Sequence, residues 1–114
     1  MWSSFTATIA INASLSDLIA VPRGMEIVGI QMPSAWTAAG LTFTAAQEAS
    51  GTFAPVYDAS GNEVSFAAST SRVIAVNPLA DGIPFGFLKI QSGTTATPVT
   101  QTAARSLIVF FRKI

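Results

Sequence analysis

Residues 33–64, PSAWTAAGLTFTAAQEASGTFAPVYDASGNEV, carry the pattern that decides the fold. Leu41, Phe43 and Ala45 alternate with two threonines, and this period of two is typical of a half-buried β-strand. Glycines within the segments EASG and DASGNE then interrupt the alternation twice, as expected for tight turns. The stretch therefore predicts short antiparallel strands that are joined by turns.

The same alternation extends outward toward both ends of the chain. About eight short strands, separated by turn signals at intervals of roughly ten residues, favour an antiparallel sandwich, jelly roll or barrel. We expect these strands near residues 5–12, 25–32, 41–45, 52–58, 64–66, 72–76, 85–91 and 105–114. The prediction is an all-β chain that forms a single antiparallel β-sandwich or jelly-roll-like domain over residues 1–114.

Three local expectations accompany this fold. Helix is limited to one or two short turns, one of them at Ser34–Ala39. Val28, Ile30 and Met32 are expected to share one face of their strand, because they are spaced two residues apart. Pro55 cannot donate a ladder hydrogen bond, so the strand that contains it is expected at a sheet edge or at a bulge.

The closing segment RSLIVFFRKI, residues 105–114, is apolar on both of its alternating rows. One row comprises Leu107, Val109 and Phe111, and the other comprises Ile108 and Phe110. An antiparallel strand with one face in water normally carries polar residues on that face. Two interpretations stay open: a central strand whose outer face is covered, and a strand whose second row contacts another subunit.

The composition of the chain excludes several functional classes. Its 114 residues contain no cysteine and no histidine, which removes disulfides, thiolate chemistry and the commonest general base and metal ligand. Six basic and six acidic residues balance to a net charge of zero, so no basic surface favours nucleic acid. Charged residues make up 11% of the chain, against roughly 25% in soluble domains. We therefore expect the working state to be an assembly.

The sequence also offers little for membranes or for catalysis. The longest apolar runs, residues 18–21 and 107–111, fall far short of the roughly 20 residues that span a bilayer, and the N-terminus does not resemble a signal peptide. The carboxylates are Asp17, Glu26, Glu48, Asp58, Glu63 and Asp81. Their spacing requires no acid–base pair, so no catalytic residue and no cofactor are expected. DASGNE is interpreted as an Asx-type turn, with a calcium loop as the alternative.

Five residues are candidates for contacts with a partner, because each adds apolar or stacking surface where a monomer would not need it. They are Trp2, Phe5, Trp36, Phe110 and Arg112. Trp36 has three open interpretations: a lid on the core, an anchor in a subunit interface, or a platform for a sugar ring. Trp2 is expected to pack on a partner if the N-terminal residues are ordered.

The order of segments resembles that of short structural proteins of tailed bacteriophages. The resemblance is carried by TATIA followed by SLS, IVGIQMPSAWTAAGLTFTAA, GTFAPVYDASGNEV and LKIQSGTTATPVTQ, and it covers nearly the whole chain. It implies a small β-sandwich in the virion, most similar in role to capsid decoration or cement proteins. The implied partners are the major capsid protein and further copies of the chain, as a dimer or trimer. The implied place is the outer surface of the capsid, after assembly from the host cytoplasm.

Two other virion roles remain open beside decoration. A head-fibre or tail module would bind glycan on the host cell surface and would use Trp36 with polar loop residues such as Asn62 and Gln91. A head–tail connector or tail-tube component is the third possibility. The number of copies in each particle separates these roles, because a decoration protein is present in hundreds of copies and a fibre in a handful.

Overall fold

Nine β-strands form the regular structure of residues 2–77 and 86–114, the part of the chain that the computed structural model describes. They are β1 (Trp2–Ile9), β2 (Ile19–Ala20), β3 (Met25–Gln31), β4 (Leu41–Ala46), β5 (Ala54–Pro55), β6 (Ser65–Phe66), β7 (Val73–Ala75), β8 (Phe87–Ser92) and β9 (Arg105–Lys113). No helix occurs in these residues, so the prediction of an all-β chain is confirmed. The search of these residues for a helix able to cross a membrane finds none.

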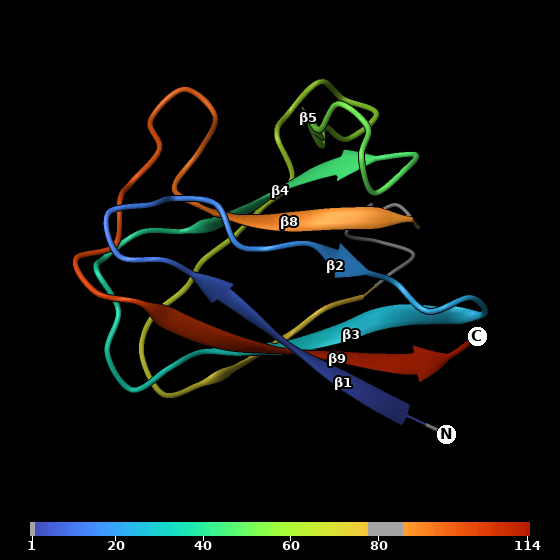
Figure 1. Cartoon of the computed structure of the whole chain (residues 1–114), viewed down its shortest axis with the longest axis horizontal. Helices are drawn as coiled ribbons and strands as arrows, with labels where there is room; N and C mark the ends of the chain where they lie inside the picture. The colour runs from blue at the N-terminus through green and yellow to red at the C-terminus, as the bar shows by residue number, and fades with distance from the viewer. Residues whose placement is uncertain (1, 78–85) are drawn as a thin grey trace.

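The strands form two antiparallel sheets that pack together (Figure 1). The first sheet has the order β1-β9-β3-β7, and the second has the order β2-β8-β4-β5 with β6 also paired to β4. Pairing is nested: β1 pairs with β9, β2 with β8, β3 with β7, and β4 with β5 and β6. Because Trp2 lies opposite Arg112 in this register, both ends of the described chain lie at one end of the first sheet (Figure 1).

One alternating row from each long strand fills the space between the sheets. Leu107, Val109 and Phe111 of β9 are buried there, as their spacing predicts. They meet Leu41 and Phe43 of β4, which are also fully buried. The aliphatic side chains of Ile9, Ile19, Ile30, Leu88 and Ile90 are fully buried as well. The core is therefore built from both sheets without disulfides.

Two strand predictions need correction. The register between β3 and β9 shifts between Ile27 and Gly29, so a β-bulge changes which side chains face inward. Ile27 and Ile30 are buried while Val28 is only half-buried, so the expected row of Val28 with Ile30 is wrong. The first strand begins earlier than predicted and ends at Ile9, which leaves Ile11 exposed.

The expected helical turn at Ser34–Ala39 is also wrong, because these residues form a loop. The indole Nε1–H of Trp36 donates to the carbonyl of Ala39 at 3.0 Å. The backbone N–H of Thr37 donates to the side-chain Oε1 of Gln101 at 2.8 Å. Two side chains, one within the loop and one distant in sequence, therefore bind backbone groups that a helical turn would have used.

The turn chemistry of the central region agrees with the sequence. Asp58 Oδ1 accepts hydrogen bonds from the backbone N–H groups of Ser60 and Asn62, each at 2.9 Å. Gly61 supplies a positive φ of 85°, so the Asx-type turn is confirmed. Pro55 lies in β5 at the end of the second sheet, as expected for proline. The long turn predicted over residues 77–84 lies almost wholly outside the described residues.

Candidate functional site

The first sheet turns one face toward the core and the other away from it, and we call the second of these the outer face. Residues directly opposite one another on paired strands place their side chains on the same face. The register therefore assigns residues to the outer face from all four strands. They are Trp2, Ser4, Thr6 and Thr8 of β1, Ser106, Ile108, Phe110 and Arg112 of β9, Glu26, Gly29 and Gln31 of β3, and Val73 and Ala75 of β7.

An apolar stripe crosses this outer face with one residue from each strand: Trp2, Phe110, Gly29 and Val73. The rings of Trp2 and Phe110 have centroids 6.2 Å apart and planes inclined by 56°. A Cβ atom added to Gly29 would lie 3.5 Å from Phe110 Cδ2 and 3.6 Å from Val73 Cγ1. Glycine therefore lets side chains from both neighbouring strands close over the backbone of β3.

The two ends of the stripe are open to solvent. Trp2 is 69% exposed and Val73 is 60% exposed, whereas Phe110 between them is half-buried. Exposed apolar residues scattered singly are normal, but a contiguous patch marks an interaction site. The stripe is therefore the strongest candidate for a contact surface among the described residues.

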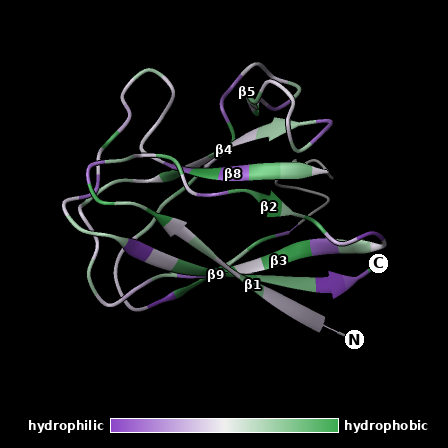
Figure 2. Ribbon diagram, in the orientation of Figure 1, coloured by the Kyte–Doolittle hydropathy of each residue, from purple (hydrophilic) through white to green (hydrophobic). Residues whose placement is uncertain are grey.

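Charge on the outer face is confined and internally paired. Arg112 lies opposite Glu26 in the register, and its guanidinium donates to Glu26 Oε1 at 3.3 Å. An exposed pair of this kind stabilises the fold by at most about 1 kcal/mol. Its effect on the surface is larger, because Glu26 and Arg112 are the charged side chains that the register places on the described outer face, and their charges balance. Figure 2 shows the strongly hydrophilic colour of β9 near its two ends, with the apolar residues between them.

The corresponding face of the second sheet is covered. Thr42, Thr44 and Gln91 alternate with the core row of their strands, yet all three are buried. Thr42 Oγ1 donates to the carbonyl of Gly93 at 2.8 Å, in the segment that follows β8. Loop segments thus cover one sheet, while the outer face of the other remains accessible.

The structure brings three of the five predicted contact residues together. Trp2, Phe110 and Arg112 lie on the outer face. Phe5 belongs to the core-facing row of β1, opposite Val109, and is 38% exposed beside the free edge of that strand. Trp36 is half-buried, packs against the core, and lies near the start of β9, away from Trp2.

Sequence reasoning missed Val73 as a surface residue. Its segment, RVIAV, alternates weakly, with apolar residues on both rows. Val73 can be recognised as part of the stripe only once β7 is known to pair with β3, because that pairing places Val73 next to Gly29 and Phe110. Long-range pairing of this kind is not encoded in local periodicity.

Sequence reasoning also missed a buried polar cluster around Gln101. This fully buried side chain accepts from Thr37 N at 2.8 Å and from Arg105 Nε at 3.1 Å. Its amide nitrogen donates to Thr37 O at 3.1 Å and to Ser92 Oγ at 2.7 Å. The cluster ties the loop after β3 to the segment that precedes β9, so its role is structural.

The residues named for a glycan site do not converge. Gln91 is buried on β8 and accepts from Thr42 Oγ1 at 3.3 Å. Asn62 is exposed in the turn led by Asp58. The indole N–H of Trp36 is bound to its own loop. These three side chains therefore share no common surface that a sugar could contact.

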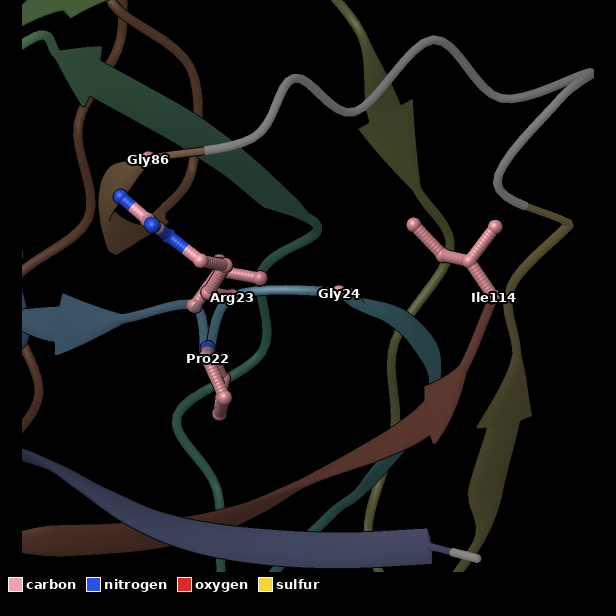
Figure 3. A pocket seen from close by; sticks show the side chains of 6 residues that line it. Pro22, Arg23, Gly24, Gly86 and Ile114 are labelled. Carbon is pink, nitrogen blue, oxygen red and sulfur yellow. The ribbon is translucent and has the colours of Figure 1, made fainter.

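Two shallow hollows offer little chemistry among the residues that line them. One, of about 380 Å³, is lined by Val21, Pro22, Arg23, Gly24, Gly86 and Ile114, and Figure 3 shows Arg23 extending toward Gly86. The other, of about 360 Å³, is lined by Gln31, Met32, Ser34, Ser71, Arg72 and Val73. Each lining holds one arginine and no Asp or Glu side chain. In the described ranges no three His, Cys, Asp or Glu side chains gather as metal ligands.

Comparison of the chain with protein-family models, with curated proteins and with solved structures finds no match.

Proposed function

We propose that the chain is a non-enzymatic structural protein of a bacteriophage virion, which self-associates and binds the lattice of the major capsid protein as a decoration or cement protein. The phage origin rests on the resemblance of segments such as MPSAWTAAGLTF and LKIQSGT. The mode of action rests on the outer face. The observation that carries the proposal is the apolar stripe that crosses all four strands of the first sheet.

The nested strand pairing supports a jelly-roll fold. A jelly roll is a long antiparallel hairpin that rolls up, so that its strands divide between two sheets. Here nested pairings join β1 to β9, β2 to β8, β3 to β7, and β4 to both β5 and β6. The rolled arms then pair β9 with β3 and β8 with β4. This architecture is frequent among viral capsid domains, although lectins and cupins share it.

The apolar stripe supports a role in which the chain binds other protein subunits through this surface. Trp2 and Val73 expose apolar surface on a face without net charge. Burial of such surface stabilises a contact by roughly 25 cal/mol per Å². A contact of modest area becomes strong when it is repeated over a shell, because each bound copy engages several neighbours. Decoration of a capsid therefore suits this surface.

The non-enzymatic part of the proposal is supported by the residues available. The chain has no histidine and no cysteine to act as base or nucleophile. Four of the five Asp and Glu side chains in the described ranges serve other groups: Asp58 caps a turn, Glu26 pairs with Arg112, and Glu63 binds Thr95 at 2.6 Å. Asp17 binds the backbone of Thr8.

The test is the number of copies in purified particles. Virions that contain the chain are banded by density, and its amount is measured against the major capsid protein by quantitative mass spectrometry. Hundreds of copies on each particle are expected. Absence from particles overturns the virion role, and a handful of copies overturns decoration in favour of a fibre, tail or connector role. Addition of purified chain to stripped capsids should restore their resistance to heat.

A further inference from the structure

The edge strand β1 is open along one side. It ends the order β1-β9-β3-β7, and within residues 2–77 and 86–114 its other side is paired only at its last residues, where Ile9 bridges Ser16 and Thr8 binds Asp17. The other strands at sheet edges in these ranges, β2, β5, β6 and β7, are two or three residues long, and β5 contains proline. Strand β1 has eight residues with no proline and no charge. Natural proteins usually protect such an edge, and this one has no protection of its own.

The hydrogen bonds of Thr8 show which backbone N–H and C=O groups of β1 point away from β9. Its N–H donates to Asp17 Oδ1 at 2.9 Å and its carbonyl accepts from Asp17 N at 3.0 Å, so both groups point away from β9. The N–H and C=O of one residue in an antiparallel strand point to the same side, and the direction alternates along the strand. The backbone groups of Thr6, Ser4 and Trp2 therefore point outward as well, and no described strand pairs with them there.

We infer that a second copy of this chain pairs its own β1 antiparallel to this edge, so that the two first sheets join across a two-fold axis at Ser4. In this register Ser4 faces the partner's Ser4, and Trp2 faces the partner's Thr6. The three outward residues of each copy then form three hydrogen-bonded pairs, with roughly six main-chain hydrogen bonds in total. Asp17 restricts the register of this pairing. A partner strand shifted toward Thr8 would need the backbone N–H and C=O of Thr8, and both are already bound to Asp17.

A second copy fits this edge better than a different chain for two reasons. The free groups are self-complementary under a two-fold axis, which is the symmetry of most dimers. The strand carries no charge that would repel its own copy. An unrelated segment would need donors and acceptors that match the outward groups of Trp2, Ser4 and Thr6. A second copy of β1 supplies these groups by symmetry.

The pairing also explains two exposed aromatic side chains. In this register Trp2 lies beside the partner's Thr6 on the outer face, so the partner's strand adds surface next to an indole whose other side rests on Phe110. On the core-facing side Phe5, which is 38% exposed, lies beside the partner's Ser3. Both faces of the new seam therefore bury apolar surface that a single copy leaves in water. The interface is short, so we expect a dissociation constant in the micromolar range, as for other weak specific contacts.

This inference deepens, and rests on, the self-association in the proposed function, but its test needs only the purified chain. Sedimentation of the wild-type chain at concentrations up to several hundred micromolar should give twice the 11.8 kDa monomer mass. Thr6→Pro removes an outward N–H that the ladder with β9 does not use, and proline is tolerated at such an edge position. It should weaken dimerisation at least tenfold. Thr6→Ala keeps the N–H and should remain a dimer.

A cysteine variant tests the register without relying on proline. The chain has no cysteine, so Ser4→Cys introduces a single thiol. Opposed residues of a hydrogen-bonded pair have Cα atoms about 5.5 Å apart, within the range for a disulfide. Oxidised Ser4→Cys should form a covalent dimer. Thr8→Cys should not, because the two Thr8 positions would lie roughly 26 Å apart.

A wild-type chain that stays monomeric at several hundred micromolar overturns the inference. So does a folded Thr6→Pro variant that still dimerises like Thr6→Ala, because the contact would then lie elsewhere. If Thr6→Pro does not fold, the wild-type sedimentation and the Ser4→Cys cross-link decide the matter. The wild-type chain could also be monomeric in solution yet abundant on particles. If Thr6→Pro then abolishes particle binding, the capsid protein occupies the edge of β1, and the inferred dimer is wrong. Absence from particles would overturn the proposed function and leave the dimer standing.

Discussion

The indole of Trp2 rests against the phenyl ring of Phe110, at the end of the first sheet where both chain ends lie. Trp2 nevertheless exposes 69% of its surface. The contact holds the tryptophan over the sheet and presents its free face outward. An aromatic side chain that is ordered but exposed loses little conformational entropy when a partner covers it. This arrangement suits an anchor in an interface.

Substitution of Phe110 by aspartate should separate assembly from folding. Phe110 lies on the outer face and is half-buried, so Phe110→Asp removes roughly 1–2 kcal/mol of packing and leaves the chain folded. The charge breaks the apolar stripe, and incorporation into particles should fall strongly. Circular dichroism checks the fold, and particle-bound protein is measured after sedimentation.

Two controls make this experiment decisive. Phe110→Leu keeps an apolar side chain and should retain particle binding. Leu107→Asp, on the buried row of the same strand, should unfold the chain. A Phe110→Asp variant that unfolds a monomer would place Phe110 in the core and would rule out the stripe as a contact surface.

Thr44 and Thr42 offer a matched pair on one face of β4. Thr44 Oγ1 is buried and has no hydrogen-bond partner, so Thr44→Val removes an unsatisfied group and should stabilise the chain by up to about 1 kcal/mol. Thr42 Oγ1 contacts Gly93 O and Gln91 Oε1, and Thr42→Val should destabilise it by about 1–3 kcal/mol. Urea unfolding measures both. Equal effects would contradict the assigned hydrogen bonds.

Gly93 and Gly61 share a φ of 85° but differ in their surroundings. A Cβ atom on Gly93 would lie 2.5 Å from Thr97 O and 2.8 Å from Val99 N, whereas one on Gly61 meets nothing within 4 Å. Gly61→Ala should therefore destabilise the chain only because alanine is unfavourable at a positive φ, by about 1–2 kcal/mol. Gly93→Ala adds a backbone clash and should cost at least about 3 kcal/mol. Thermal unfolding compares the two, and similar melting temperatures would mean that the loop after β8 moves freely.

The polar cluster around Gln101 should be more important for stability than its position in an apparent loop suggests. Gln101→Leu leaves Thr37 N, Thr37 O and Ser92 Oγ without their side-chain partner. A loss of about 3 kcal/mol is expected, since buried polar groups lose their hydrogen bonds. Gln31→Leu, at an exposed position of β3, should change stability by less than about 0.5 kcal/mol. Equal losses would show that the cluster is not cooperative.

Local periodicity predicted much of this fold because the strands that fill the core alternate cleanly. Leu41 and Phe43, and also Leu107 and Val109, face inward as their spacing requires. The rows of β3 were misplaced because a β-bulge between Ile27 and Gly29 adds a residue to one strand only. Such a shift depends on the partner strand and leaves no mark on the sequence of β3.

The candidate site was predictable in part for the same reason. The spacing of the closing strand predicted that Ile108 and Phe110 face away from the Leu107 row, and the outer face of β9 carries both. Val73 and Gly29 join Phe110 only through the order of strands, and Asp17 becomes relevant only because it binds Thr8. The polar cluster at Gln101 was invisible, since glutamine in a Ser/Thr-rich stretch is usually solvated.

The place of β9 between β1 and β3 also determines when the first sheet can form during synthesis. Strand β9 leaves the ribosome after every other strand described, and both β1 and β3 need it as their neighbour. Contacts between distant segments form slowly, because a long loop must close first. A nascent chain therefore holds β1 unpaired until residues 105–113 emerge. A product that stops before β9 would leave β1 and one edge of β3 unpaired and open to proteases, so we expect only chains that contain β9 to accumulate for assembly.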